Sequence, residues 1–199
     1  MQSIQTVSEN TIYVGASDRR LAKFENLFPI PRGVSYNAYV ILDEKTALLD
    51  TADASVGAQF LENVAAALDG RKLDYLIVDH MEPDHAAMIE AVLVRWPDLR
   101  LVVNAKTLPM LKMYFPTDSA AIDDALVVKE GDTLDLGKHK LTFVMAPMVH
   151  WPEVMMTFDT TTGTLFSADA FGTFGALEGA LFADEVDFAG KWLDDARRY

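Results

Sequence analysis

The sequence contains no cysteine. A disulfide scaffold, a cysteine-ligated zinc or iron–sulfur site and a thiol nucleophile are therefore excluded within this chain. Basic residues are also scarce, because 17 Lys and Arg stand against 30 Asp and Glu and give a formal net charge of −13. Since binding to nucleic acid depends on a positively charged surface, we expect no nucleic-acid partner.

Long apolar runs are missing as well. A membrane-spanning helix needs about 18 uninterrupted apolar residues, and the sequence has no such run, so we expect no membrane association. The first residues, Met1 to Gln5, show no basic region followed by an apolar stretch, the pattern of a secretion signal. We therefore expect a cytoplasmic protein.

The composition that remains is that of an ordinary globular domain. The 199 residues are 50% hydrophobic and 24% charged, and this length suffices for one domain with a sizeable core. No internal repeat, low-complexity tract or Gly/Ser-rich linker divides the chain. We expect residues 1–199 to form one domain.

The order of the expected elements indicates a mixed α/β protein. Strands that form hairpins come first and strands that alternate with helices follow, so a sandwich is favoured over a purely parallel sheet. Apolar side chains at every fourth position from Val56 to Leu68 predict one of the helices. The expected strands are residues 12–16, 37–42, 46–50, 73–78, 101–104, 125–128, 141–144, 155–159 and 163–167, and the expected helices are residues 55–68, 86–96, 105–115 and 184–198.

A dense group of metal-binding residue types follows the expected strand 73–78. Side chains at the end of a buried strand point into the crevice where α/β proteins place their sites. Pro83 is expected to exclude a helix here, and an extended loop would aim alternate side chains in one direction. As an alternative, Asp84 could cap a helix that starts near Ala86. The group consists of His80, Glu82, Asp84 and His85.

Two further candidates come later in the chain, each just beyond a short apolar strand. These are His150 and Asp169. Taken alone, His150 could be a core histidine and Asp169 a turn or capping residue, but with the first group they complete a constellation of imidazoles and carboxylates. His139 lies between two lysines and is expected to be a solvated turn residue.

Electrostatics supports the prediction of a metal site. The carboxylates of Glu82, Asp84 and Asp169 would repel one another in one pocket, and without metal at least one would take up a proton. Two divalent cations would relieve this repulsion and would couple assembly of the site to folding. The residue types therefore predict a site for two metal ions.

These motifs resemble those of the flavodiiron proteins, whose metal-binding module is a variant of the metallo-β-lactamase fold. The similarity extends along essentially the whole chain and implies an αββα sandwich. The matching motifs are His80-x-Glu82-x-Asp84-His85, His150 within His-Trp-Pro-Glu, Asp169 within Phe-Ser-Ala-Asp-Ala-Phe-Gly, Val34-Ser35-Tyr36-Asn37 and Leu48-Leu49-Asp50-Thr51.

The resemblance also implies which metal is bound and by which residues. Hydrolytic relatives of this fold carry a histidine where this chain has Glu82. Because His-rich sites suit zinc whereas mixed carboxylate and imidazole ligation suits redox-active iron, this difference favours two non-haem irons. The implied ligands are His80, Glu82 and His150 for one iron, Asp84 and His85 for the other, and Asp169 as the bridge between them.

The chain departs from the family's pattern at its C-terminal end. Flavodiiron proteins supply a further histidine to the second iron from a segment beyond position 199, and they carry a flavodoxin-like domain that binds FMN. We therefore expect residues 1–199 to be the first part of the module, an αββα sandwich lacking its C-terminal end. FMN is expected only on a flavodoxin-like domain outside this chain.

The resemblance implies partners for electron transfer. Electrons would come from the flavodoxin-like domain or from a flavoprotein, with rubredoxin a candidate carrier upstream. In the family's head-to-tail dimer, or dimer of dimers, one subunit's flavin lies beside the other's metals. That places the flavin near His150 and Trp151 and makes Trp151 a candidate cofactor contact. Trp151 and Phe171 would also limit water near the site, and packing in the core is the alternative role for both.

The leading interpretation is a di-iron oxidoreductase module that reduces O2 to water, NO to N2O, or both. One alternative is a zinc-dependent hydrolase of the same fold, such as a lactonase or thioesterase, although Glu82 argues against it. The other is a di-iron oxygen sensor without turnover, which the missing flavodoxin part would favour.

Overall fold

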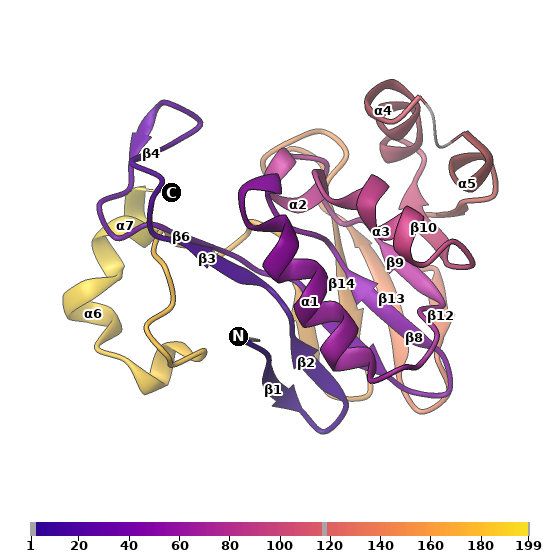
Figure 1. The fold of residues 1–199 in the computed structure, drawn as a ribbon, viewed down its shortest axis with the longest axis horizontal. Helices are drawn as coiled ribbons and strands as arrows, with labels where there is room; N and C mark the ends of the chain where they lie inside the picture. The colour runs from indigo at the N-terminus through magenta and orange to yellow at the C-terminus, as the bar shows by residue number, and fades with distance from the viewer. Residues whose placement is uncertain (1–2, 117–118, 199) are drawn as a thin grey trace.

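The computed structural model describes residues 3–116 and 119–198, which form two main sheets with helices beside them (Figure 1). The strands are β1 (Gln5–Ser8), β2 (Thr11–Tyr13), β3 (Ala16–Asp18), β4 (Lys23–Phe24), β5 (Phe28–Pro29), β6 (Val34–Tyr36), β7 (Tyr39–Leu42), β8 (Thr46–Leu49), β9 (Tyr75–Ile77), β10 (Arg100–Asn104), β11 (Leu126–Val128), β12 (Thr133–Asp135), β13 (Lys140–Met145), β14 (Met155–Asp159) and β15 (Thr164–Phe166). The helices are η1 (Ala54–Val56), α1 (Gly57–Leu68), α2 (Pro83–Ala86), α3 (Ile89–Arg95), α4 (Thr107–Tyr114), α5 (Ser119–Asp123), η2 (Ala183–Glu185), α6 (Phe188–Lys191) and α7 (Leu193–Arg198).

The larger sheet has seven strands in the order β1-β2-β7-β8-β9-β10-β11, and the smaller has four in the order β12-β13-β14-β15. β7 and β8 form the expected antiparallel hairpin, whereas β8, β9, β10 and β11 run parallel. Parallel neighbours need crossover connections, and helices supply them between each pair. The carboxyl ends of these strands therefore meet at one edge of the sheet, where α/β proteins place their sites.

Two hydrophobic cores arise because successive side chains of a strand point to opposite faces. In β8, Leu48 packs with the helices and the next residue, Leu49, packs between the sheets. In β10, Val103 packs with the helices and Val102 packs between the sheets. From the smaller sheet, Phe143 and its neighbours complete the second core. The layers are therefore helices, seven-stranded sheet and four-stranded sheet.

The mixed α/β fold expected from the sequence is confirmed. The described residues form one helical layer and the two sheets of the expected αββα sandwich. Helices α1 and α3 cover the outer face of the larger sheet, and α6 and α7 lie beside β3, β4 and β6 at the opposite end of the molecule from α4 and α5 (Figure 1). Among the described residues, no helix has the length and apolar character needed to cross a membrane.

The structure corrects two expected helices. Pro83 does not exclude a helix, because it is the first residue of α2, where its missing N–H is harmless. The expected helix 86–96 is therefore divided into α2 and α3, and Asp84 lies in the first turn of α2 instead of capping a helix from Ala86. The expected helix 184–198 is interrupted at Val186, whose backbone is extended, and consists of η2, α6 and α7.

Candidate metal centre

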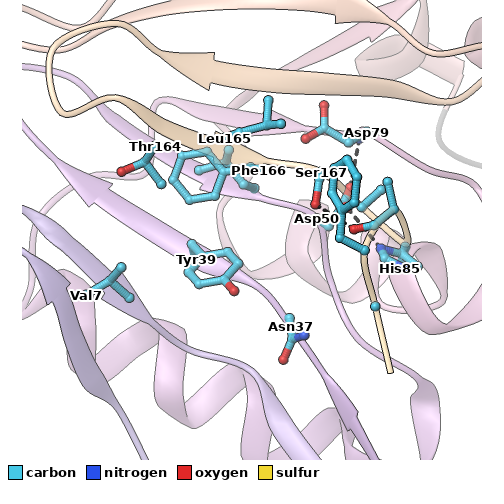
Figure 2. Close-up of a pocket in the computed structure, with 15 residues that line it drawn as sticks. Val7, Asn37, Tyr39, Asp50, Asp79, His85, Thr164, Leu165, Phe166 and Ser167 are labelled. Carbon is cyan, nitrogen blue, oxygen red and sulfur yellow. Dashed lines mark hydrogen bonds and ion pairs between the residues drawn. The ribbon is translucent and has the colours of Figure 1, made fainter. Parts of the chain in front are cut away.

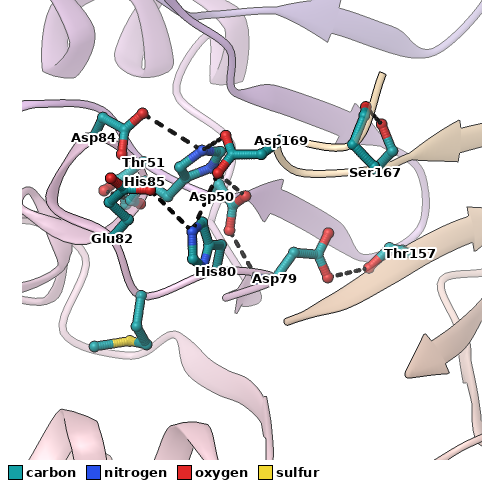
Figure 3. A network of polar contacts seen from close by, with 12 residues as sticks. Asp50, Thr51, Asp79, His80, Glu82, Asp84, His85, Thr157, Ser167 and Asp169 are labelled. Carbon is teal, nitrogen blue, oxygen red and sulfur yellow. Dashed lines mark hydrogen bonds and ion pairs between the residues drawn. The ribbon is translucent and has the colours of Figure 1, made fainter. Parts of the chain in front are cut away.

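The six ligand candidates predicted from the sequence all converge at one edge of the two sheets, and Figure 3 shows five of them, all but His150. His80 follows β9, and the three residues of its motif lie at the start of α2 or within it. His150 lies on the loop between β13 and β14, and Asp169 follows β15. Both sheets therefore contribute, since β9 belongs to the larger and the other strands to the smaller.

The ligand atoms form two groups that share Asp169. Asp169 Oδ1 lies 2.9 Å from His85 Nε2, whereas Oδ2 lies 3.2 Å from His80 Nε2 and 3.1 Å from His150 Nε2. In the first group, Glu82 Oε2 lies 3.2 Å from His80 Nε2 and 2.8 Å from His150 Nε2. Within each group, ligand atoms all lie within 4.8 Å of one another. The first group consists of His80, Glu82, His150 and Asp169. The second consists of Asp84, His85 and Asp169.

The donor set fits two divalent cations. Asp84 Oδ1 is buried and accepts no hydrogen bond from the described residues, and Asp169 Oδ2 is buried with only the imidazoles of His80 and His150 close to it, at 3.2 and 3.1 Å. An unpaired buried carboxylate oxygen is unfavourable, and a cation is the partner that both oxygens and the surrounding imidazoles can share. Burial, together with the neighbouring charges of Glu82 and Asp169, raises the pKa of Asp84 to about 6.

Without metal, the imidazoles and carboxylates of the site stabilise one another's charged forms. Burial alone would lower the pKa of His80, but hydrogen bonds with Asp169, Glu153 and Glu82 outweigh it and raise that pKa to about 11. The same balance, with Asp169 and Asp50 as partners, raises the pKa of His85 well above its ordinary value. For Asp169, burial acts to raise the pKa, and hydrogen bonds from the two imidazoles lower it on balance.

We expect metal binding to release protons, because both imidazoles must be neutral to act as ligands. At pH 7 about two protons should leave per pair of metal ions, and affinity should rise between about pH 6 and pH 8. In the metal-free chain the sign is opposite: protonated His80 stabilises the fold below its ordinary pKa of 6.5, and this contribution is lost as the pH rises through about 11. Calorimetric titration in buffers of different ionisation enthalpy measures the protons released. A pH-independent affinity would contradict the expectation.

Two further carboxylates contact the buried imidazoles through Nδ1, the ring nitrogen that faces away from the ligand groups. No role was predicted for either of them from the sequence. His85 Nδ1 lies 2.9 Å from Asp50 Oδ2, and His80 Nδ1 lies 2.8 Å from Glu153 Oε1. Asp50 stands in the motif after β8 and Glu153 ends the His-Trp-Pro-Glu motif, so both were visible as motif members. Their partners became apparent only in the folded chain.

Asp79 extends this network between the two sheets. Its carboxylate accepts a hydrogen bond from the Thr157 hydroxyl at 2.8 Å, and its backbone N–H donates to Asp50 Oδ1 at 2.7 Å. Burial, followed by the nearby charge of Asp50, raises the pKa of Asp79 well above its ordinary value. A cavity of about 260 Å³ reaches these groups and His85 from the side of Tyr39 (Figure 2).

One expectation for a single residue is wrong, and two alternatives do not hold. His139 is not solvated: its side chain is buried, and its Nδ1 lies 2.8 Å from Asp159 Oδ2. His150 is not a core histidine, since 52% of its side chain is exposed. Phe171 does not pack in the core either, because it is 89% exposed. Trp151 packs edge-on against His80, with ring centroids 5.4 Å apart.

The exposed side of the site opens into a cavity of about 480 Å³. Glu82, His150 and Asp169 lie at its base, and most of its wall is apolar. The apolar residues include Phe24, Phe28, Met148, Phe171 and Phe174. A small uncharged molecule could therefore reach the group of His80, Glu82 and His150 and the shared Asp169 from this side.

Two facing sheets, helices on one side and paired His/carboxylate groups on the loops at one edge define a metallo-β-lactamase-like fold with a candidate two-metal site. The chain belongs to the ODP family of β-lactamases, whose model matches residues 34–192.

Relatives of known name agree with this assignment. The chain is 36% identical over 195 residues to a nitric oxide reductase of Moorella thermoacetica, covering 97% of this chain and 47% of that protein. It is 38% identical over 183 residues to an anaerobic nitric oxide reductase flavorubredoxin of Klebsiella pneumoniae, covering 91% of this chain and 37% of that protein. The chain thus spans less than half the length of these relatives.

Solved structures show the same fold. The flavodiiron protein of Giardia intestinalis superposes with a TM-score of 0.88 at 28% identity, over 96% of this chain and 45% of that one. Rubredoxin oxygen:oxidoreductase of Desulfovibrio gigas superposes with a TM-score of 0.88 at 30% identity, over 94% of this chain and 46% of that one. The resemblance to flavodiiron proteins inferred from the sequence is confirmed.

Proposed function

We propose that this chain is the di-iron module of an oxidoreductase that reduces O2 to water, NO to N2O, or both. The observation that carries the proposal is the division of six ligand candidates into two groups that share Asp169. Names of relatives, a nitric oxide reductase and a rubredoxin oxygen:oxidoreductase, support the choice of substrates. His80, Glu82 and His150 would hold the first iron, Asp84 and His85 the second, and Asp169 both.

When bound, two ferrous ions supply electrons in pairs and offer open positions to a diatomic substrate. The chain's own residues shape access to those positions. Trp151 packs against His80 and excludes water from that side, while His150 and the apolar cavity leave the opposite side open to a small uncharged molecule. Three described residues serve the second position against four for the first, so we expect the second to bind metal more weakly.

We further propose that electrons reach the site from FMN on a flavodoxin-like domain or a separate flavoprotein, with rubredoxin as the carrier upstream. The flavin would approach His150 and Trp151 across a head-to-tail dimer. Exposed apolar side chains at this face support such a contact, since Met148 is 70% and Phe171 89% exposed. Binding of the flavin by Trp151 and a cytoplasmic location stay predictions.

The proposal is tested by loading the chain with ferrous iron under anaerobic conditions, measuring metal per chain, and following O2 and NO consumption with a reduced flavoprotein. Two bound irons and consumption that depends on the flavoprotein would support it. Zinc binding with hydrolysis of lactones or thioesters would favour the hydrolase alternative. Bound iron without turnover in the presence of the donor would favour the sensor.

Metal choice at the first position should depend on Glu82. Replacing Glu82 with histidine removes the carboxylate that lies 2.8 Å from His150 Nε2 and offers a third imidazole, so preference should move from iron towards zinc by about an order of magnitude. Competition between ferrous iron and zinc under anaerobic conditions measures the change. Glu82→Gln, which adds no imidazole, is the control and should weaken both metals. An unchanged ratio in the histidine variant would contradict the assignment of Glu82.

A further inference from the structure

Glu153 is held firmly beneath His80. Its Oε1 lies 2.8 Å from His80 Nδ1 and accepts a hydrogen bond from the Met81 backbone N–H at 3.0 Å. Asn104 donates a side-chain hydrogen bond to the Glu153 carbonyl, which fixes the backbone on the other side. The Glu153 side chain has 0% exposure, so its carboxylate has no access to bulk solvent.

Stability alone does not account for a carboxylate in this place. The second oxygen, Oε2, is buried and has no hydrogen-bond partner among the described residues. A buried charge with an unpaired oxygen is unfavourable, and an apolar side chain of similar volume is often as stable or more so. The contact with His80 is therefore the feature of Glu153 that needs an explanation.

That contact determines which nitrogen of His80 faces the metal site. An ionised carboxylate can only accept, so Nδ1 carries a proton, and once the ring is neutral only Nε2 is left to bind a metal. Nε2 lies 3.2 Å from both Glu82 Oε2 and Asp169 Oδ2, in the middle of the first ligand group. Asp50 holds Nδ1 of His85 in the same way, at 2.9 Å, and serves the second group.

We propose that Glu153 is the positioning residue of the first metal position: it holds His80 in the Nδ1-protonated tautomer with Nε2 directed at the metal. Asp50 is the corresponding residue of the second position. The inference rests on the proposed metal site and adds that each position has its own supporting carboxylate, so that the two can be weakened separately.

The test compares Glu153→Ala and Glu153→Gln with wild type, using cobalt(II) as a probe of affinity and anomalous diffraction to read the occupancy of each position. Loss of a carboxylate behind a metal-bound imidazole lowers affinity by about 10- to 100-fold. We expect that loss at the His80 position in Glu153→Ala, with the His85 position changed by less than about threefold. Glu153→Gln keeps an oxygen that can accept from Nδ1 and should recover most of the affinity. Asp50→Ala is the matched control: it should weaken the His85 position and leave the His80 position changed by less than about threefold.

A merely structural role predicts other results. Both positions would weaken together, and glutamine would not restore selectivity between the positions. Any of these patterns, or full affinity in Glu153→Ala, overturns the inference while leaving the proposed function intact. A wild-type chain that binds no metal overturns both.

If the alanine variant fails to fold, nuclear magnetic resonance of the glutamine variant provides a second test. In the zinc-loaded wild type, His80 should show a slowly exchanging, strongly downfield proton on Nδ1. This proton should move upfield in Glu153→Gln, because a neutral amide oxygen is a weaker acceptor than a carboxylate. Coordination of the metal through Nδ1 of His80, or an unchanged proton shift in the variant, would overturn the assignment.

Discussion

Replacing Asp169 with alanine is expected to empty both metal positions. Asp169 is the member common to both ligand groups, with Oδ1 2.9 Å from His85 Nε2 and Oδ2 3.2 Å from His80 Nε2. Its removal takes one ligand from each position and leaves neighbouring imidazoles without their shared carboxylate. Iron per chain should therefore fall from about two ions to nearly none after anaerobic loading and desalting, measured by elemental analysis.

Two control variants test whether the loss of iron is specific to Asp169. Asp98→Ala removes an exposed carboxylate that belongs to neither ligand group and should leave the iron content unchanged. His85→Ala affects only the second group, so the first iron should stay bound. Iron content in Asp169→Ala equal to that of wild type would show that the bridging role is wrong, and loss of one ion alone would assign Asp169 to a single position.

Replacing Phe143 with alanine is expected to cost about 3–5 kcal/mol of unfolding free energy. Phe143 lies in β13 with 0% exposure, in the core between the two sheets. Truncation there removes apolar contacts and leaves a cavity that two stiff sheets can close only in part. Urea denaturation of the metal-free chain measures the loss without a contribution from bound metal.

The adjacent residue supplies the control. Val144 points to the opposite side of β13 and is 36% exposed, so Val144→Ala should change stability by only about 0.5 kcal/mol. A comparable loss in the two variants would contradict the assignment of Phe143 to the core between the sheets. If Phe143→Ala is destabilised as expected, its metal content at low temperature should stay close to that of wild type, because Phe143 is not a ligand candidate.

The sequence predicted the elements whose identity depends on local pattern. Strands β8, β10 and β14 correspond to the expected strands 46–50, 101–104 and 155–159, because apolar residues dominate each of them. Strands β1, β4, β5 and β12 were not expected. They are two to four residues long and partly exposed, and each pairs with a strand only a few residues away, so hydrogen bonds to that strand define them rather than a run of apolar side chains.

The candidate site could be predicted as far as residue types alone indicate metal ligands. His80 to His85 form a motif of metal-binding types, and that motif could be read without coordinates. The environment of a residue could not. His139 is flanked by lysines and would be solvated in a free turn, yet Asp159, 20 positions further on, pairs with it in the buried region. The same limit hid the contact of Glu153 with His80, which spans 73 positions.

The spread of the ligands along the chain also sets an order of events during synthesis. His80 and Asp169 are 89 positions apart, since 169 − 80 = 89. Ribosomes add about 5–20 residues per second, so the bridging carboxylate is made about 4–18 s after the first imidazole. Within that interval the chain first makes β10 and β11, which complete the larger sheet, and then the strands of the smaller sheet, whose loops carry His150 and Asp169. The complete set of ligand candidates is therefore present only after the two sheets have joined, and under the proposed function we expect iron insertion to be a late step of maturation.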